Sequence, residues 1–201
     1  MAIMTSEPEP LWLIEQALDQ TAAVIQAVAP GQASWPTPCR DWDVHALVTH
    51  LAGQDLRNFI VSVRGETADW QAPPEDIGDD WAAAFAARAQ WLKAEWRAAD
   101  LDRLFPMPGG GEAPLRTRAS QQAAEFAVHD WDLAKATGQR ADLDPRLAEH
   151  ALAWSRGMLR PEFRGPGKAF DAEVPVSQDA PAYDRLAGWF GRDPGWSPAA
   201  S

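Results

Sequence analysis

The sequence predicts an all-α protein, because apolar residues recur at helical spacing in four long segments that glycine- and proline-rich breaks separate. No run of alternating polar and apolar residues is long enough to build a sizeable sheet. The chain has 201 residues, 46% of them hydrophobic, which suits one globular domain with a substantial core. We therefore expect a helical bundle.

The first two predicted helices flank an irregular segment. Apolar residues repeat at helical spacing over residues 11–28, which predicts the first helix. Residues 31–40 contain two prolines and a glycine and are expected to be irregular. A second helix is expected to begin near Asp41 or Asp43, either of which can cap it, and to end at Gly65.

The next two predicted helices are separated by a clear break. Asp79 and Asp80 are placed to cap a third helix that continues through Trp96. Residues 101–114 contain prolines and three consecutive glycines, which cannot continue a helix. A fourth helix is expected over residues 115–137, with a glycine immediately after its last turn.

A shorter fifth helix and a tail complete the chain. The helix is expected over residues 145–158, and the tail is rich in glycine and proline. Within the tail, residues 172–176 suit a short extended piece and residues 183–190 a last short helix. We therefore expect a helical bundle over residues 1–160 and a C-terminal extension over 161–201 packed on it, within a single domain.

Composition and charge exclude several classes of protein. The formal charge of −11 and the lack of a Lys/Arg cluster argue against binding to nucleic acid or to an anionic membrane surface. Residues 1–10 have no basic segment and no apolar run, so we expect no signal peptide, and no segment has the apolar length of a transmembrane helix. A single cysteine, Cys39, cannot form an intrachain disulfide and suits the cytoplasm. The sequence leaves open whether the protein is a monomer or a homodimer.

A polar line on the fourth predicted helix is the strongest candidate for chemistry. Glu125 and His129 are four residues apart, and Asp132 follows three residues later, so all three side chains share one helix face. Such a line can form half of a metal site or of an acid/base site, or it can face water. His50, on the second predicted helix, is the best candidate to complete a site.

A helical wheel at about 100° per residue describes the second helix. The apolar stripe centres between Leu51 and Asp55, and His50 falls near its edge, with Gln54 and Arg57 continuing along the same side. A histidine beside an apolar stripe is more often a hydrogen-bonded core residue than a ligand, and most Glu/His pairs at this spacing are exposed. Spacing alone therefore leaves both interpretations open.

Three motifs resemble one protein family. They are Trp35-Pro-Thr-Pro-Cys-Arg-Asp-Trp-Asp-Val, Leu47-Val-Thr-His-Leu-Ala-Gly, and Glu125-Phe-Ala-Val-His-Asp-Trp-Asp-Leu-Ala-Lys-Ala-Thr-Gly. In this order they resemble the DinB-like superfamily and, within it, proteins related to the N-terminal domain of mycothiol-dependent maleylpyruvate isomerase. The tail from Asp184 to Trp196 resembles a short actinobacterial branch of that family.

The resemblance implies a DinB-like four-helix bundle with up-up-down-down connections and a site for one divalent metal ion. The implied ligands are His50, Glu125 and His129, and the implied ion is zinc, with nickel as an alternative. The isomerase itself carries a second, C-terminal domain that contributes to its active site, whereas this chain ends at Ser201. We therefore do not expect isomerisation of maleylpyruvate itself.

The resemblance also implies a small thiol such as mycothiol as cofactor or partner, together with an electrophilic substrate. Our first hypothesis is a metal-dependent thiol S-transferase or isomerase in which the metal activates a thiolate. Arg57 and Gln54 are candidates for binding the cofactor or an anionic group. Asp132 is a candidate base, and Asp130 and Asp132 are also candidates for orienting His129. The alternatives are a hydrolase with metal-bound water and a metal- or ligand-binding protein without turnover.

The remaining candidate residues have plainer interpretations. Cys39 stands near a helix N-terminus, where a thiolate is favoured, but a buried and inert thiol is the preferred interpretation. We expect His45 to be solvated and His150 to be a reserve ligand only if its helix folds over the metal. Trp42 and Trp131 are expected to fill the core.

Overall fold

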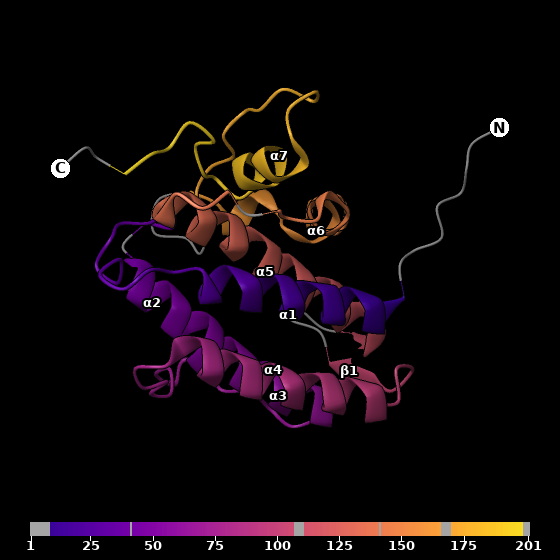
Figure 1. The fold of residues 1–201 in the computed structure, drawn as a ribbon. Helices are drawn as coiled ribbons and strands as arrows, with labels where there is room; N and C mark the ends of the chain where they lie inside the picture. Colours follow the sequence, from indigo (N-terminus) through magenta and orange to yellow (C-terminus); the bar gives the residue numbers. More distant parts are fainter. Residues whose placement is uncertain (1–8, 41, 107–110, 141, 166–169, 199–201) are drawn as a thin grey trace.

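Helices form the body of the structure, a computed structural model that describes residues 9–40, 42–106, 111–140, 142–165 and 170–198. Four long segments lie side by side as a bundle (Figure 1), namely α1 (Pro10–Gln26), the run from α2 (Val44–Thr49) to α3 (Leu56–Arg64), α4 (Trp81–Ala98) and α5 (Arg116–Thr137). The prediction of an all-α bundle is confirmed. Within the described part of the chain, no helix is long and apolar enough to cross a membrane.

The second helical segment differs from the continuous helix that the sequence predicts. Asp43 caps its start by accepting a hydrogen bond from the Ala46 N–H at 2.8 Å, whereas the alternative cap, Asp41, lies outside the described residues. Between α2 and α3, His50–Asp55 forms a π-helical turn, η1. Gly53 lies in this turn against the following loop, where a Cβ atom would come within 2.4 Å of the Glu75 carbonyl oxygen.

The long helices begin and end close to the predicted positions. Asp80 caps α4 by accepting a hydrogen bond from the Ala83 N–H at 3.0 Å. The predicted break between α4 and α5 contains a small antiparallel hairpin that the sequence did not indicate, β1 (Leu104–Pro106) paired with β2 (Glu112–Pro114). Helix α5 ends at Gly138, which adopts the left-handed conformation with φ of 68°.

The C-terminal third lies on one side of α5. Helix α6 (Pro145–Met158) and helix α7 (Ala182–Trp189) lie above it in Figure 1, joined by a path that includes a short 3₁₀ turn, η2 (Pro161–Phe163). Residues 172–176 do not form a strand. Instead, the Val174 N–H donates a hydrogen bond to the Gly188 carbonyl at 2.9 Å and holds this segment against α7.

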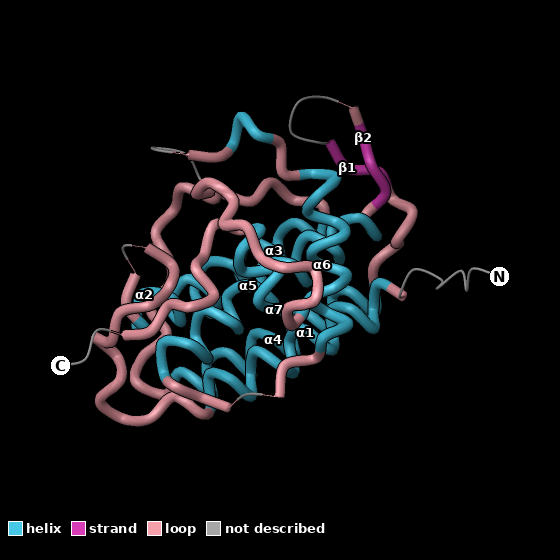
Figure 2. The backbone as a smooth tube through the Cα atoms, turned by 90° about the horizontal axis from the view of Figure 1, so that it is seen from above, coloured by secondary structure: helices cyan, strands magenta, loops and turns pink. Residues whose placement is uncertain are grey.

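Helix α5 lies between two hydrophobic clusters. One cluster joins it to the other bundle helices, and the second joins it to α6 and α7. Viewed from above, the helices gather around α5 and the hairpin lies at the periphery (Figure 2). Because both sides of α5 are covered, its polar line is largely interior, and His129, Asp130 and Asp132 are all buried. The solvated-face interpretation of that line is therefore wrong.

Candidate metal centre

The structure brings together the three side chains that the sequence proposes as metal ligands. His50, Glu125 and His129 each offer one donor atom, and these atoms lie within 4.8 Å of one another. The two imidazole rings meet edge to face, with their centroids 5.4 Å apart. Two imidazoles and one carboxylate are a donor set that zinc uses in catalytic sites.

The π-helical turn determines how His50 is held. Gln54 donates from Nε2 to the carbonyls of Trp70 at 3.1 Å and Ala72 at 3.3 Å, so its Oε1 faces the ring and accepts from His50 Nδ1 at 2.9 Å. Because Nδ1 then carries a proton, Nε2 is the nitrogen that can bind a metal. On the Nε2 side, Oδ2 of Asp55 lies at 3.1 Å.

Asp55 is a fully buried carboxylate, and its one ion pair within the described part of the chain is with His50. Burial alone would lower the pKa of His50, but Asp55, together with Glu125 and Gln54, outweighs it and raises that pKa to about 9. The pKa of Asp55 is itself raised by burial, against the opposing effect of His50. In the absence of another cation, His50 is therefore protonated at neutral pH.

Glu125 adds a second carboxylate to the same region. Its pKa is raised by burial and by the charge of Asp55, and lowered by His129, His50 and Arg192. The residue is only partly enclosed, as is His50, whereas His129 is buried. The accessible edge of the cluster therefore lies at Glu125 and His50.

His129 is fixed from the other side. Its Nδ1 lies 3.0 Å from Oδ2 of Asp132, one turn further along α5. Arg192 reaches the same carboxylate with two donors, Nε to Oδ1 at 3.2 Å and Nη2 to Oδ2 at 3.0 Å. Burial opposes ionisation of Asp132, but Arg192 and His129 outweigh it and lower its pKa. An ionised Asp132 accepts a hydrogen bond from Nδ1–H of His129. The nitrogen of His129 that is left to bind a metal is therefore Nε2, as in His50.

Trp42 forms a wall against both imidazoles. Its ring centroid lies 4.5 Å from that of His50 and 5.8 Å from that of His129. The loop that carries it is braced by Thr37, whose hydroxyl donates to the carbonyls of Cys39 at 3.0 Å and Trp42 at 2.9 Å. Trp42 therefore contacts the site directly, beyond the core-filling role that the sequence suggested.

A second set of donors shares His129. Cys39 Sγ, His129 and Asp132 also have ligand atoms within 4.8 Å of one another. Burial raises the pKa of Cys39 to about 12, and a protonated thiol is a poor ligand. Asp132 is already bound to Arg192. The set with His50 and Glu125 is therefore the better metal site, and Cys39 is a packing residue.

The donor set fits a divalent cation. Asp55 and Glu125 are two acidic groups whose charges repel each other, and the described polar partner of Asp55 is His50, itself a proposed ligand. Unpaired buried carboxylates are unfavourable unless they are protonated or meet a cation. A divalent ion near the Nε2 atoms would compensate both charges. Carboxylate and imidazole ligands suit zinc and other first-row divalent ions.

Comparison with known proteins agrees with this architecture. Residues 14–134 match the family model described as the mycothiol maleylpyruvate isomerase N-terminal domain. The chain belongs to this family. It is also 34% identical, over 195 residues, to the uncharacterized proteins Rv0738 and MT0763 of two strains of Mycobacterium tuberculosis, and the matches cover 92% of this chain and 98% of each relative.

Solved structures share the fold of this maleylpyruvate isomerase family member. Crystal structures of the mycothiol-dependent maleylpyruvate isomerase and of its histidine-to-alanine variant superpose with TM-scores of 0.54 and 0.53. Each match covers 80% of this chain and 72% of the isomerase, at 14% sequence identity. At that identity the likeness establishes the fold alone.

The two candidate cofactor-binding residues fasten the loop after α3 in this family member. Arg57 donates from Nη1 to the Pro73 carbonyl at 2.9 Å and from Nη2 to the Ala72 carbonyl at 3.4 Å. Gln54 holds Ala72 and Trp70 from the same side, as described above. Binding of a cofactor by Arg57 or Gln54 stays a prediction, whereas their contacts with this loop are direct.

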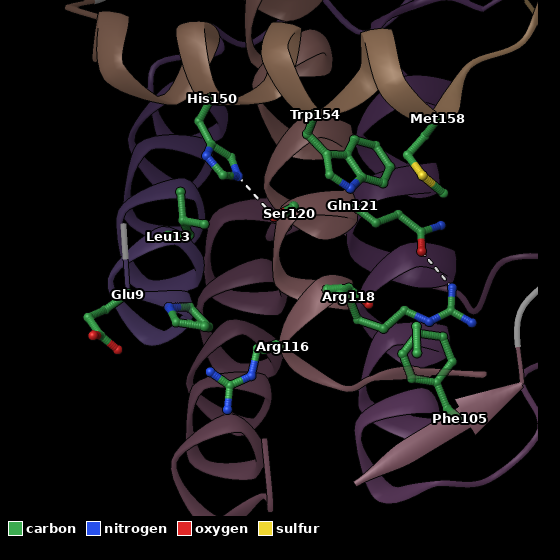
Figure 3. A pocket seen from close by; sticks show the side chains of 13 residues that line it. Glu9, Leu13, Phe105, Arg116, Arg118, Ser120, Gln121, His150, Trp154 and Met158 are labelled. Atoms are coloured by element: carbon green, nitrogen blue, oxygen red, sulfur yellow. Dashed lines mark hydrogen bonds between the residues drawn. The ribbon is translucent and has the colours of Figure 1, made fainter. Parts of the chain in front are cut away.

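The other two histidines lie elsewhere. His45 is exposed, with its ring 5.4 Å from that of Trp81. His150 contacts Ser120 Oγ at 2.9 Å and lines a cavity of about 560 Å³ at the opposite end of α5 (Figure 3). Ser120 precedes His129 by nine residues, or about 13 Å along the helix. His150 is thus well separated from the cluster and is not a reserve ligand.

Sequence reasoning missed two residues of the site. Asp55 was assigned to the apolar stripe, and an aspartate in the middle of such a stripe was itself the available signal. Arg192 lies 60 residues beyond Asp132, and no local spacing links them.

Proposed function

We propose that this protein is a metal-dependent enzyme that acts with a small thiol of the mycothiol type, as an S-transferase or an isomerase. The observation that carries the proposal is the convergence of His50, Glu125 and His129 next to the buried Asp55 carboxylate. Three protein ligands leave a metal at least one open position, which is the arrangement of catalytic sites. The family model and the solved relatives, which are named for mycothiol, support the choice of a thiol.

A divalent metal bound here would lower the pKa of a coordinated thiol and so favour the thiolate. The protein's own groups supply the rest. Asp55, which is not one of the three proposed ligands, lies beside Nε2 of His50 and is placed to accept the proton that the thiol loses. Trp42 covers the two imidazoles and limits the access of water on that side.

Elemental analysis tests the metal part of the proposal. Wild-type protein purified without a histidine tag is expected to contain about one equivalent of zinc or another divalent ion, and a His50→Ala variant is expected to lose it. His45→Ala is the matched control, because His45 is exposed and contacts Trp81 outside the cluster. Equal metal content in all three proteins, or none in the wild type, would overturn the metal centre.

Activity assays test the thiol part. Mycothiol and a bimane electrophile are incubated with metal-loaded protein, with chelator-treated protein and with His50→Ala. A loss of free thiol that is faster than the uncatalysed rate, and only with metal, supports the proposal. Cleavage of an ester or amide without thiol would instead identify a hydrolase. No loss of thiol and no cleavage would identify a binding protein without turnover. Either of those two outcomes overturns the assignment as a thiol enzyme.

A further inference from the structure

We infer that the C-terminal segment, residues 170–198, contributes to the metal centre, because its Arg192 orients the ligand His129 through Asp132. This inference rests on the proposed metal centre and extends it to a part of the chain outside the family match, which ends at residue 134. It assigns Arg192 a positioning role, since the arginine acts on a ligand through another side chain.

Arg192 and Asp132 form a bidentate and largely buried ion pair. Nε and Nη2 donate to the two carboxylate oxygens at 3.2 and 3.0 Å, while Asp132 is completely buried and the Arg192 side chain is 11% exposed. The remaining nitrogen, Nη1, donates to the Phe190 carbonyl at 2.9 Å. All three nitrogens are thus engaged within the protein, which favours positioning over binding of a substrate anion.

The same carboxylate oxygen serves both partners. Oδ2 of Asp132 accepts from Arg192 Nη2 and lies 3.0 Å from Nδ1 of His129. By donating to both carboxylate oxygens, Arg192 fixes the orientation of Asp132 beside His129. His129 therefore holds its proton on Nδ1 and directs Nε2 toward His50 and Glu125.

Close backbone contacts fix the conformation of the turn that carries Arg192. Gly191 has φ of 84°, and a Cβ atom there would lie 2.6 Å from Asp171 Cβ and 2.9 Å from the Ala172 carbonyl oxygen. The backbone N–H of Arg192 then closes the end of α7 by donating to the Ala187 carbonyl at 2.9 Å. This geometry turns the chain back toward α5.

Two further contacts hold the segment on the helix that carries His129. Trp131 Nε1 donates to Asp184 at 3.2 Å, and Lys135 Nζ donates to the Pro194 carbonyl at 2.9 Å. These residues lie on either side of Asp132 along α5. The C-terminal segment is thus attached to the part of the helix that holds the ligand, and the arginine–aspartate pair is the contact that reaches the ligand itself.

The test compares Arg192→Gln with Arg192→Lys and with a control. Zinc affinity is measured by competition with a chromophoric chelator, and the His129 tautomer is measured in metal-free protein by ¹⁵N NMR of the imidazole. We expect Arg192→Gln to weaken zinc binding by 10- to 100-fold and to shift His129 away from the Nδ1–H tautomer. Arg192→Lys keeps the positive charge but cannot donate to both carboxylate oxygens in the same way. It is expected to recover part of the zinc affinity and part of the Nδ1–H tautomer, and it serves as the test if Arg192→Gln does not fold.

Arg185→Gln is the matched control, because Arg185 belongs to the same segment but pairs with Glu149 and the Ala180 carbonyl. It is expected to leave zinc affinity within twofold of the wild type. Asp132→Asn should weaken zinc binding about as much as Arg192→Gln, and the double variant should lose little more, since the two act in one chain of contacts.

The inference is overturned if a folded Arg192→Gln protein keeps both the wild-type zinc affinity and the Nδ1–H tautomer, or if the two substitutions are additive. Its failure can be told apart from failure of the metal centre. A wild-type protein that binds no metal overturns the proposed function, whereas the tautomer measurement on metal-free protein still tests the link from Arg192 to His129.

Discussion

Oδ2 of Asp55 lies 3.1 Å from Nε2 of His50, although the two residues are five positions apart in a helical segment. On a regular α-helix, five residues turn through about 140° beyond a full circle, which would point these side chains in different directions. In a π-helical turn, residues i and i+5 are joined by the backbone hydrogen bond and lie one above the other. The widened turn thus places a carboxylate beside the ligand nitrogen.

The first prediction concerns proton release at this pair. His50 has its pKa raised to about 9, so below that pH a metal must displace a proton from Nε2, and metal affinity is expected to fall as the pH decreases. Asp55→Asn removes the carboxylate that raises the pKa. At pH 8 the variant is expected to release about one proton fewer than the wild type on binding zinc. Calorimetry in buffers of different ionisation enthalpy measures this number, and equal release would contradict the prediction.

The second prediction concerns Gly53 in the π-helical turn. A methyl group there would meet the Glu75 carbonyl at 2.4 Å, and the Gly53 carbonyl already accepts from the Glu75 N–H at 3.2 Å. Gly53→Ala is expected to lower the free energy of unfolding by about 1–3 kcal/mol, the usual effect of overpacking. Gly157→Ala in α6 is the control, because no atom lies within 4 Å of its Cβ position.

The control should raise the free energy of unfolding by about 0.5–1 kcal/mol, since alanine is the better helix former. Urea denaturation of both variants measures the two effects. If Gly53→Ala proved as stable as the wild type, the close approach of the Glu75 loop would be wrong.

The third prediction separates two residues that hold the same loop. Gln54 and Arg57 both donate to the Ala72 carbonyl, but Gln54 also accepts from His50 Nδ1. Gln54→Ala is therefore expected to weaken zinc binding by roughly tenfold or more, as loss of a partner that orients a ligand usually does. Arg57→Ala should loosen the loop and leave zinc affinity within about threefold of the wild type. Chelator competition distinguishes them, and equal effects would mean that the loop, and not the histidine contact, is responsible.

The fourth prediction concerns the pH dependence of stability. Asp130 is completely buried, accepts from Gln20 Nε2 at 2.7 Å through Oδ2, and has no described hydrogen-bond partner at Oδ1. Burial raises its pKa to about 8, against about 3.9 in the unfolded chain. Between these values the native state binds more protons, so the free energy of unfolding falls with increasing pH, by at most about 1.4 kcal/mol per pH unit from this group.

Asp130→Asn cannot ionise and keeps an oxygen for Gln20. It is expected to flatten this decline, so that its stability relative to the wild type improves from pH 5 to pH 8.5. Asp142→Asn, which removes an exposed carboxylate, is the control and should not flatten the curve. Guanidinium titrations of metal-free protein at several pH values provide the measurement. Parallel curves for Asp130→Asn and the wild type would show that Asp130 is ionised in the native state.

The sequence by itself determined the helical bundle and most of its boundaries. Hydrophobic periodicity and local capping decided these features, and both act over a few residues, as at Asp43, Asp80 and Gly138. It also placed Glu125 above His129, because one turn of a regular helix fixes that pairing. His50 was linked to them by resemblance in motif, since no spacing rule joins two helices.

Only the tertiary structure decided what surrounds these ligands. The π-helical turn that pairs His50 with Asp55 departs from the α-helical period, so a wheel drawn at that period places Asp55 among apolar residues. Arg192 reaches Asp132 through the folding of a distant segment. Burial of the polar line on α5 depends on contacts with His50, Trp42 and Arg192, which come from other parts of the chain. These features arise from packing between distant segments and from one irregular turn. Neither produces a repeating pattern of polar and apolar residues in the sequence.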